Sequence, residues 1–258
     1  MSRNDELDLV LQRIKSKEDW ESLAEICDCK SSIKVSELPY ADLIKKFNLE
    51  IRSNYGNTFV NIFRNEYEPD YAVILKDTAK KLKIKAVPDG MLSLYDVECL
   101  EKEVLKVVLE QVKAQIVKEK GYQAWNEIET KAQQGMEKLY AEGKITLEEM
   151  NDLKKYVGAG GMIALITLGN LSGFLIYMIA NQLFFAISRY LGLGIGVAVA
   201  GPVIGQTLAL LLGPVGWVLS GLWLLIGFGD TNWKKTIGAV VFIAAQRQQQ
   251  KYAARMRG

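Results

Sequence analysis

The sequence contains no histidine. This absence excludes acid/base catalysis by histidine, nucleophile pairs of serine or cysteine with histidine, and metal sites with a histidine ligand. There are three cysteines, Cys27, Cys29 and Cys99. The C-x-C pair lacks the second pair of ligands that a structural zinc site requires, so we expect buried or half-buried free thiols and no metal or cofactor.

Carboxylates are the remaining candidates for acid/base chemistry. Glu98, Glu101 and Glu103 lie on an expected helix, without the Glu-x-x-His pairing of carboxylate metal sites. We expect these three side chains to be solvated. The sequence therefore predicts a protein that is not an enzyme, with no catalytic, cofactor-binding or metal-ligating residue.

Two further patterns are missing. The N-terminus, Met-Ser-Arg-Asn-Asp-Glu, has no apolar segment, so we expect no cleavable secretory signal and synthesis in the cytosol. No alternation of apolar and polar residues predicts a strand. Helical spacing of apolar residues runs instead from the start to Tyr156, which predicts an all-α front part.

Helix starts are marked by capping residues or by proline. These are Asn4 or Asp5, then Ser16, Pro39, Ser93 and Thr146. Gly121 ends the longest expected helix, and a further short helix is expected around Phe59 and Phe63. We expect a short N-terminal helical module over residues 1–35 and a helical domain over residues 36–156.

Lysines surround the helix expected over residues 70–85. They are Lys76, Lys80, Lys81, Lys83 and Lys85. Such a cluster can bind nucleic acid or an anionic headgroup, but the interleaved aromatic residues and the arginine-rich groove of nucleic-acid sites are missing. We expect a solvated face and no nucleic-acid partner.

Charge is nearly absent from the third quarter of the chain. Between Tyr156 and Asn232 the ionised side chains are Arg189 and Asp230. A helical crossing of a bilayer needs roughly 20 apolar residues, so residues 156–188 suffice for one crossing and residues 190–229 nearly suffice for a hairpin. The sequence predicts a glycine-rich apolar hairpin or transmembrane region over residues 157–232, and a basic C-terminal helix or tail over residues 233–258.

The first apolar run predicts a continuous helix from about Met162 to Ser188, behind a glycine joint that includes Gly161. Asn170, Asn181 and Gln182 interrupt its apolar surface. Polar amides in such a helix usually bond to a neighbouring helix, so we expect a companion.

Several residues suit the interface between membrane and water. They are Arg189, Tyr190, Trp217, Trp223, Trp233, Lys234 and Lys235. For the tryptophans, packing in the core of a helical bundle is an equal alternative. The basic C-terminal residues favour the cytoplasmic side, so both termini are expected in the cytoplasm.

Glycines in the second run allow close helix packing and predict a homo-oligomer. They are Gly192, Gly196, Gly201, Gly205 and Gly213. The spacing around Gly192 does not predict a phosphate loop, because no strand precedes it and no Lys-Ser or Lys-Thr follows.

Six segments carry a likeness to a known family. They are Arg3–Val10, Tyr55–Arg64, Tyr71–Lys83, Gly213–Trp217, Thr236–Val240 and Ile243–Arg247. Together they resemble the YaaW-like family of uncharacterised bacterial proteins. The resemblance implies a bacterial helical protein with a short N-terminal module and an apolar C-terminal region rich in glycine and alanine, and it implies no activity.

Two hypotheses follow. In the first, a cytosolic helical domain senses or docks a protein partner, and the apolar hairpin inserts into the lipid bilayer of the bacterial inner membrane, oligomerises and permeabilises it as a pore-forming protein. In the alternative, the protein is a soluble, cytoplasmic interaction or chaperone-like module whose apolar run is buried in a bundle or an oligomer interface. The discriminating feature is whether the front helices have enough apolar surface to cover that run.

Overall fold

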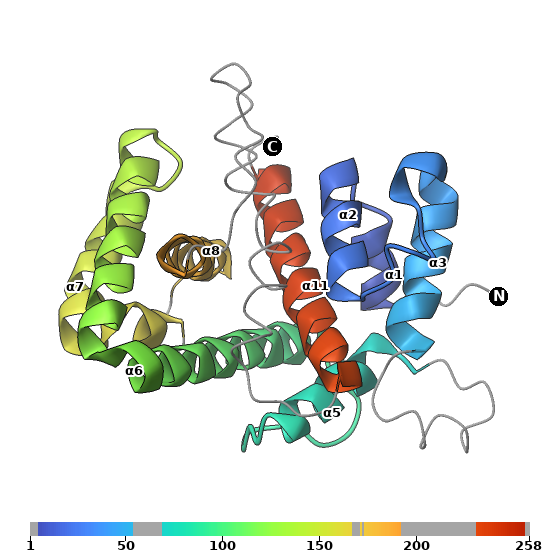
Figure 1. The fold of residues 1–258 in the computed structure, drawn as a ribbon, viewed down its shortest axis with the longest axis horizontal. Helices are drawn as coiled ribbons and strands as arrows, with labels where there is room; N and C mark the ends of the chain where they lie inside the picture. The colour runs from blue at the N-terminus through green and yellow to red at the C-terminus, as the bar shows by residue number, and fades with distance from the viewer. Residues whose placement is uncertain (1–4, 54–68, 167–170, 172, 192–230, 256–258) are drawn as a thin grey trace. The chain divides into compact units, whose positions relative to one another are not determined.

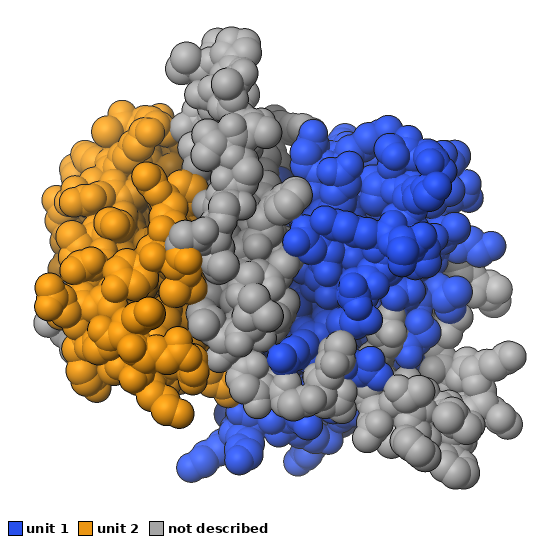
Figure 2. Space-filling model, viewed as in Figure 1, with its two compact units in different colours: residues 1–104, 227–258 blue, residues 105–226 orange. Residues whose placement is uncertain are grey.

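The computed structural model describes residues 5–53, 69–166, 171, 173–191 and 231–255. Every regular element in this part of the chain is a helix, so the all-α prediction is confirmed there (Figure 1). The chain divides into two compact units: unit 1 is residues 1–104 with 227–258, and unit 2 is residues 105–226 (Figure 2). The segment boundaries expected from the sequence stay predictions.

Unit 1 begins with two short helices whose caps agree with the sequence. In α1 (Glu6–Leu11) the Asp5 side chain accepts from the backbone of Leu7 and Asp8, and Asp8 bonds back to the backbone of Asp5. In α2 (Lys17–Ile26) the Ser16 hydroxyl accepts from the backbone of Asp19. These side chains satisfy amide groups that the first turn of a helix leaves without partners.

A 3-10 turn, η1 (Val35–Glu37), leads to α3 (Tyr40–Ser53), which starts directly after Pro39 as expected. Trp20 of α2 stacks on Phe47 of α3 with ring centroids 5.2 Å apart. The next described helix is α5 (Tyr71–Lys81). The short helix predicted around Phe59 and Phe63 lies outside the described residues.

The core of unit 1 is completed by the last described helix, α11 (Thr231–Arg255), which packs against α1, α2 and α5. All of its residues from 236 to 247 are buried. A helix buried on every side belongs to a protein core rather than to a surface. The expected basic C-terminal tail is therefore, over residues 231–255, a central helix of unit 1.

The longest helix, α6 (Leu94–Ala141), is broken at Gly121, as the sequence predicts. Gly121 has φ 82° and ψ 169°, a conformation that is essentially restricted to glycine. The apolar positions along one face of its first part are all buried. They are Val97, Leu100, Val104, Val108, Val112 and Ile116.

In unit 2, α7 (Leu147–Leu165) starts with the predicted capping box between Thr146 and Glu149. A second break lies at Gly161, whose φ is 81°. Beyond it, α7 ends at Leu165, and α8 (Gly173–Tyr190) begins as a separate helix that packs against α7. The predicted continuous helix from Met162 to Ser188 is therefore wrong.

Among the residues that the structure describes, no helix is both long enough and apolar enough to cross a membrane. The apolar helix α8 has 18 residues, a length of about 27 Å at 1.5 Å per residue, and two amides and an arginine lower its hydropathy. The second apolar run, from residue 192 to 229, lies outside the described part of the chain. The transmembrane prediction is thus not supported by any described helix.

Candidate functional site

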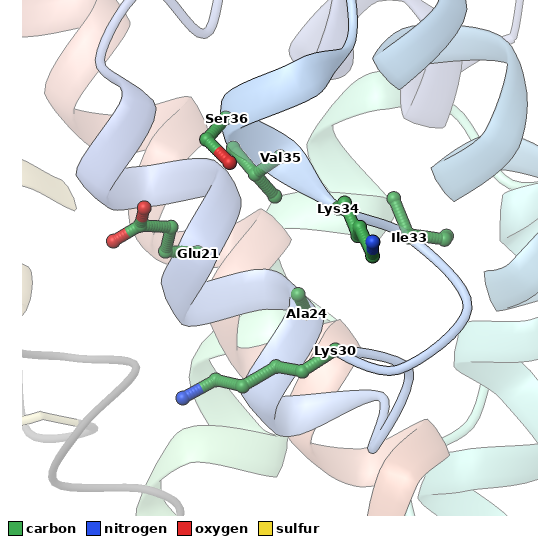
Figure 3. Close-up of a pocket in the computed structure, with 7 residues that line it drawn as sticks. All are labelled: Glu21, Ala24, Lys30, Ile33, Lys34, Val35 and Ser36. Atoms are coloured by element: carbon green, nitrogen blue, oxygen red, sulfur yellow. The ribbon is translucent and has the colours of Figure 1, made fainter.

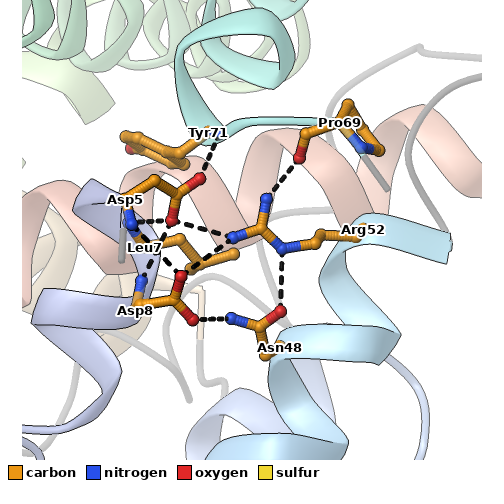
Figure 4. A network of polar contacts seen from close by, with 7 residues as sticks. All are labelled: Asp5, Leu7, Asp8, Asn48, Arg52, Pro69 and Tyr71. Atoms are coloured by element: carbon orange, nitrogen blue, oxygen red, sulfur yellow. Dashed lines mark hydrogen bonds and ion pairs between the residues drawn. The ribbon is translucent and has the colours of Figure 1, made fainter. Parts of the chain in front are cut away.

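A well-connected polar group in unit 1 is the side chain of Arg52 on α3, which is 1% exposed. Its Nη2 atom contacts Asp5 Oδ1 at 2.8 Å and Asp8 Oδ2 at 3.5 Å, and its Nε donates to Asn48 Oδ1 at 2.7 Å. Its Nη1 donates to the Pro69 carbonyl, so the guanidinium joins α1, α3 and the start of α5 (Figure 4). We call these groups the Arg52 cluster.

In the Arg52 cluster, the Asp5 carboxylate accepts more hydrogen bonds than the Asp8 carboxylate. Besides capping α1, Asp5 accepts the backbone N–H of Tyr71 at 2.8 Å. Burial raises the pKa of Asp5, but the hydrogen bonds from Arg52 and from the Tyr71 backbone outweigh burial and hold the pKa below its usual value. For Asp8, burial and the nearby charge of Asp5 keep the pKa above its usual value. Asp5 is therefore the carboxylate that Arg52 keeps ionised.

A second buried ion pair lies on the other side of Tyr71. The Nε atom of Arg247 on α11 lies 3.2 Å from both carboxylate oxygens of Glu101 on α6. The Tyr71 hydroxyl donates to Glu101 Oε1 at 2.8 Å, and the Arg247 guanidinium lies over the Tyr71 ring. Glu101 is 3% exposed, so the prediction that this carboxylate is solvated is wrong.

The electrostatics of this pair explain why it persists in the core. Burial raises the pKa of Glu101, and the positive charge of Arg247 and the Tyr71 hydrogen bond limit that rise. Burial and the Glu101 charge raise the pKa of the Tyr71 hydroxyl well above its usual value, so it stays a donor. Both oxygens of the Glu101 carboxylate accept hydrogen bonds, so the polar contacts of Glu101 with Tyr71 and Arg247 join α5, α6 and α11.

A hollow of about 280 Å³ opens beside α2 on unit 1 (Figure 3). Its lining residues are Glu21, Ala24, Lys30, Ile33, Lys34, Val35 and Ser36. Lys30 is paired with Glu25 at 2.9 Å and Lys34 with Glu37 at 3.4 Å. Its two cations already have carboxylate partners, so this hollow does not by itself indicate a ligand.

The cysteines behave as predicted. Cys27 and Cys29 are buried, Cys99 is half-buried, and all three are free thiols. The hydrogen bond to Cys29 and burial raise the pKa of Cys27 well above its usual value, which disfavours the reactive thiolate. Within the described ranges, no group of three or more Cys, Asp or Glu side chains is placed to hold a metal ion.

The predicted membrane-interface residues fall into two places. On α8, Arg189 is exposed and lies over the Phe185 ring, and Tyr190 is half-exposed. On α11, Trp233 lies under the Lys81 ammonium at 5.4 Å, Lys235 pairs with Asp28 at 3.3 Å, and Lys234 is half-exposed. Trp217 and Trp223 lie outside the described residues, and the membrane role of the whole set stays a prediction.

The predicted packing glycines, Gly192, Gly196, Gly201, Gly205 and Gly213, also lie outside the described residues. Two other glycines make close helix contacts in unit 2. A Cβ at Gly135 would lie well under 3.0 Å from Gln182, and one at Gly161 would collide with Glu129. Gln182 thus lies against α6. A neighbouring helix at this amide is what the sequence predicts.

Glu129 shows why the chain can break at Gly161. Its Oε1 atom accepts the backbone N–H of Met162 at 2.6 Å, just beyond the break. The carboxylate satisfies an amide that the new helix start leaves without an intrahelical partner. No local pattern predicts this contact, because Glu129 and Met162 are 33 positions apart.

An exposed apolar loop precedes α6, and the sequence did not single it out. Met91 is 98% exposed, Tyr95 76% and Leu94 52%. Three large apolar side chains within five residues form a patch, whereas single exposed ones are ordinary. In the sequence, the available signal was the run of apolar residues Met91, Leu92, Leu94 and Tyr95 within five positions.

Comparison with known proteins gives distant relatives. Two proteins of Helicobacter pylori strain J99, each described as a UPF0174 protein, are 25% and 27% identical to this chain over 83% and 82% of its length and 74% and 91% of their own. A UPF0174 protein of strain 26695 is 28% identical over 82% of this chain and 91% of its own length. The chain is similar to bacterial UPF0174 proteins.

That similarity supports the expected likeness to an uncharacterised bacterial family. None of these three relatives carries the YaaW-like name. No family model matches the chain, and no solved structure matches it. The description of these relatives as UPF0174 proteins states no activity, substrate or partner.

Proposed function

We propose that this protein is a non-enzymatic helical interaction module whose apolar C-terminal half is buried within the protein or in an oligomer interface. The observation that supports it best is the burial of α11 over residues 236–247. These residues flank the apolar run, and a membrane hairpin would place them at an interface. Their packing against α1, α2 and α5 uses this flank as protein core instead.

Helix α8 supports the same proposal. It is the longest described piece of the apolar region, and its residues from 175 to 181 are all buried. Gln182 lies against Gly135 of α6, so polar as well as apolar side chains of α8 have protein neighbours. This is the arrangement expected for an apolar helix sheltered in a bundle.

The competing hypothesis is a hairpin that inserts into the bacterial inner membrane, with both termini in the cytoplasm, and permeabilises it. It depends on the uncharged run from residue 190 to 229, most of which lies outside the described residues. The YaaW-like resemblance stays a prediction and does not separate the two hypotheses, since it implies no activity.

Membrane fractionation with an alkaline carbonate wash separates them. We expect the full-length protein in the carbonate-extracted fraction, with no potassium efflux from the expressing cells. Retention in the washed pellet would overturn the proposal, and retention together with efflux would favour the permeabilising hairpin.

The oligomer is tested on the purified protein by size-exclusion chromatography with light scattering, without detergent. If the glycine-rich run forms the interface, Gly201→Leu with Gly205→Leu should lower the assembled mass. Leu49→Ser, at a 54% exposed position on α3, is the control and should leave the mass unchanged. An unchanged mass in the double glycine variant would count against that interface.

A further inference from the structure

The loop between α5 and α6 is held at both ends by hydrogen bonds. After α5, the backbone N–H of Ile84 donates to the Ala79 carbonyl at 2.9 Å. Farther on, the Lys76 ammonium donates to the carbonyl of Gly90, which ties the turn to α5. The loop is therefore an ordered feature of unit 1.

The start of α6 fixes the other side of the loop. Asp96 Oδ2 accepts from the Ser93 backbone at 2.9 Å and from its hydroxyl at 2.6 Å, and the Ser93 hydroxyl accepts from the Asp96 backbone. This is a reciprocal helix cap. Leu92, at 8% exposure, anchors the segment in the core next to it.

Against this support, Met91 points fully outward. A side chain that is 98% exposed has almost no protein around it, so it sits on a convex tip rather than in a groove. Tyr95, at 76% exposure, is the second residue of α6, and Leu94 lies between Met91 and Tyr95 in sequence. The tip is thus apolar, ordered and convex.

The helix and loop that lead to the tip are rich in lysine. The lysines of this segment are Lys76, Lys80, Lys81, Lys83 and Lys85. Lys76 and Lys80 share one face of α5, because they are four residues apart on a helix, and Lys76 reaches the turn itself. The acids of the segment are fewer: Asp77 lies 3.6 Å from Lys80, Asp96 caps α6, and Asp89 is exposed.

We propose that the tip formed by Met91, Leu94 and Tyr95 docks peripherally on an anionic lipid surface, with the surrounding lysines contacting the headgroups. A convex apolar tip enters a deformable headgroup layer, whereas a protein partner would need a matching pocket. Lysine is depleted at protein interfaces and favoured beside anionic lipid, where tyrosine is also enriched. This docking goes beyond the proposed function and needs no inserted hairpin.

Vesicle sedimentation of the full-length protein tests the proposal. The probes are vesicles of mixed phosphatidylglycerol and phosphatidylcholine, compared with vesicles of phosphatidylcholine alone. We expect binding to the anionic vesicles that weakens with added salt. Met91→Ser with Tyr95→Ser should weaken it about tenfold or more, because two partly inserted side chains are lost.

The charge contribution has its own variants. Lys80→Gln and Lys85→Gln should each weaken binding about fivefold, the factor that corresponds to about 1 kcal/mol for a lysine near an anionic surface. Leu49→Ser, which removes an exposed leucine away from the loop, is the matched control and should bind as the unaltered protein does. Circular dichroism checks that each variant is folded.

Three results would overturn the docking proposal. One is no binding to anionic vesicles; another is equal binding by the Met91→Ser, Tyr95→Ser variant. The third is that the protein binds another protein through Met91 and Tyr95 and does not bind vesicles, which would make the partner of the tip a protein. Failure of the proposed function is separate, because an inserted hairpin resists the carbonate wash whether or not the loop is altered, while peripheral docking is reversed by that wash.

Discussion

A buried carboxyl on α2 gives the sharpest test of the structure of unit 1. Asp19 is 4% exposed and faces Gln246 of α11. Burial raises the pKa of Asp19 to about 7, with a smaller contribution from the charge of Glu18, while the hydrogen bond with Gln246 opposes the rise. Near neutral pH this carboxyl must either keep its proton or place a charge in the core.

The size of the effect follows from the shift in pKa. An aspartate in an unfolded chain has a pKa near 3.9, so the folded value is higher by about three units, which corresponds to about 4 kcal/mol. Asp19 also lies in the first turn of α2, where the helix dipole favours a negative charge by about 0.3–1 kcal/mol. We therefore expect a net effect of about 2–4 kcal/mol.

The sign is fixed by the direction of the shift. Since the folded pKa of Asp19 is raised, its contribution to stability is complete below the unfolded pKa, near pH 4, and is lost as the pH rises through about 7. Asp19→Asn removes this dependence while keeping the size of the side chain. The variant should match the unaltered protein near pH 4 and exceed its free energy of unfolding by about 2–4 kcal/mol near pH 8.

Urea denaturation followed by circular dichroism, repeated from about pH 4 to pH 8, measures this difference. Other carboxyls of the protein also titrate over this range, but they cancel when the variant is subtracted from the parent. Glu21→Gln, at an exposed position on the same helix, is the control and should change stability by less than about 0.5 kcal/mol throughout. A difference for Asp19→Asn that does not vary with pH would refute the reasoning.

Three further predictions concern the buried ion pairs and the helix breaks. Arg247→Met leaves a buried carboxylate without its cation, so urea denaturation should show a loss of about 3–5 kcal/mol; adding Glu101→Gln should recover most of it, and no recovery would contradict a loss caused by charge. Arg52→Lys replaces a fork of donors by one ammonium and should cost about 1–3 kcal/mol in the same assay; a negligible loss would contradict the bridging role. Gly161→Ala should lower the melting temperature more than Gly121→Ala, because both need a glycine conformation, at about 1–3 kcal/mol each, and only at Gly161 would the new Cβ meet a carboxylate. Equal losses would rule out that collision.

Helix starts in this chain could be predicted from sequence because capping is local. Asp5, Ser16 and Thr146 each bond to a backbone amide within three residues, so the residue type and its immediate neighbours contain the whole interaction. The break at Gly121 is equally local, since it depends on the conformational freedom of one residue. The same reasoning predicted the joint that includes Gly161, but not the end of the following helix at Leu165.

Long-range pairs could not be predicted in this way. Glu101 and Arg247 are 146 positions apart, and nothing in the neighbourhood of either residue indicates the other. A glutamate on a charged helix is usually exposed to solvent. That expectation is wrong for Glu101, because Tyr71 and α11 both contact its carboxylate. The Arg52 cluster is similar: its acceptors come from the start of α1, from α3 and from Pro69, two residues before α5.

The role of α11 was hidden by an ambiguity of hydropathy. The mostly apolar part of α11, residues 236–247, is short enough to lie either in a protein core or at the membrane boundary. Only tertiary contacts decide between these two locations. In unit 1 those contacts come from helices at the opposite end of the sequence. Met91 shows the reverse case, since its apolar character predicts burial and the ordered loop exposes it.

The charges on α11 complete the argument about the apolar run. Basic residues beside such a run are ordinarily taken as evidence for a cytoplasmic membrane flank. Here Arg247 is paired with Glu101, Lys235 with Asp28 and Lys251 with Glu98, so these cations meet carboxylates of the acidic front part of the chain. Arg247, whose side chain is 8% exposed, is held in the core by its pair with Glu101, whereas an exposed pair contributes at most about 1 kcal/mol. The charge of Arg247 therefore belongs to the core of unit 1 and does not by itself indicate a membrane flank.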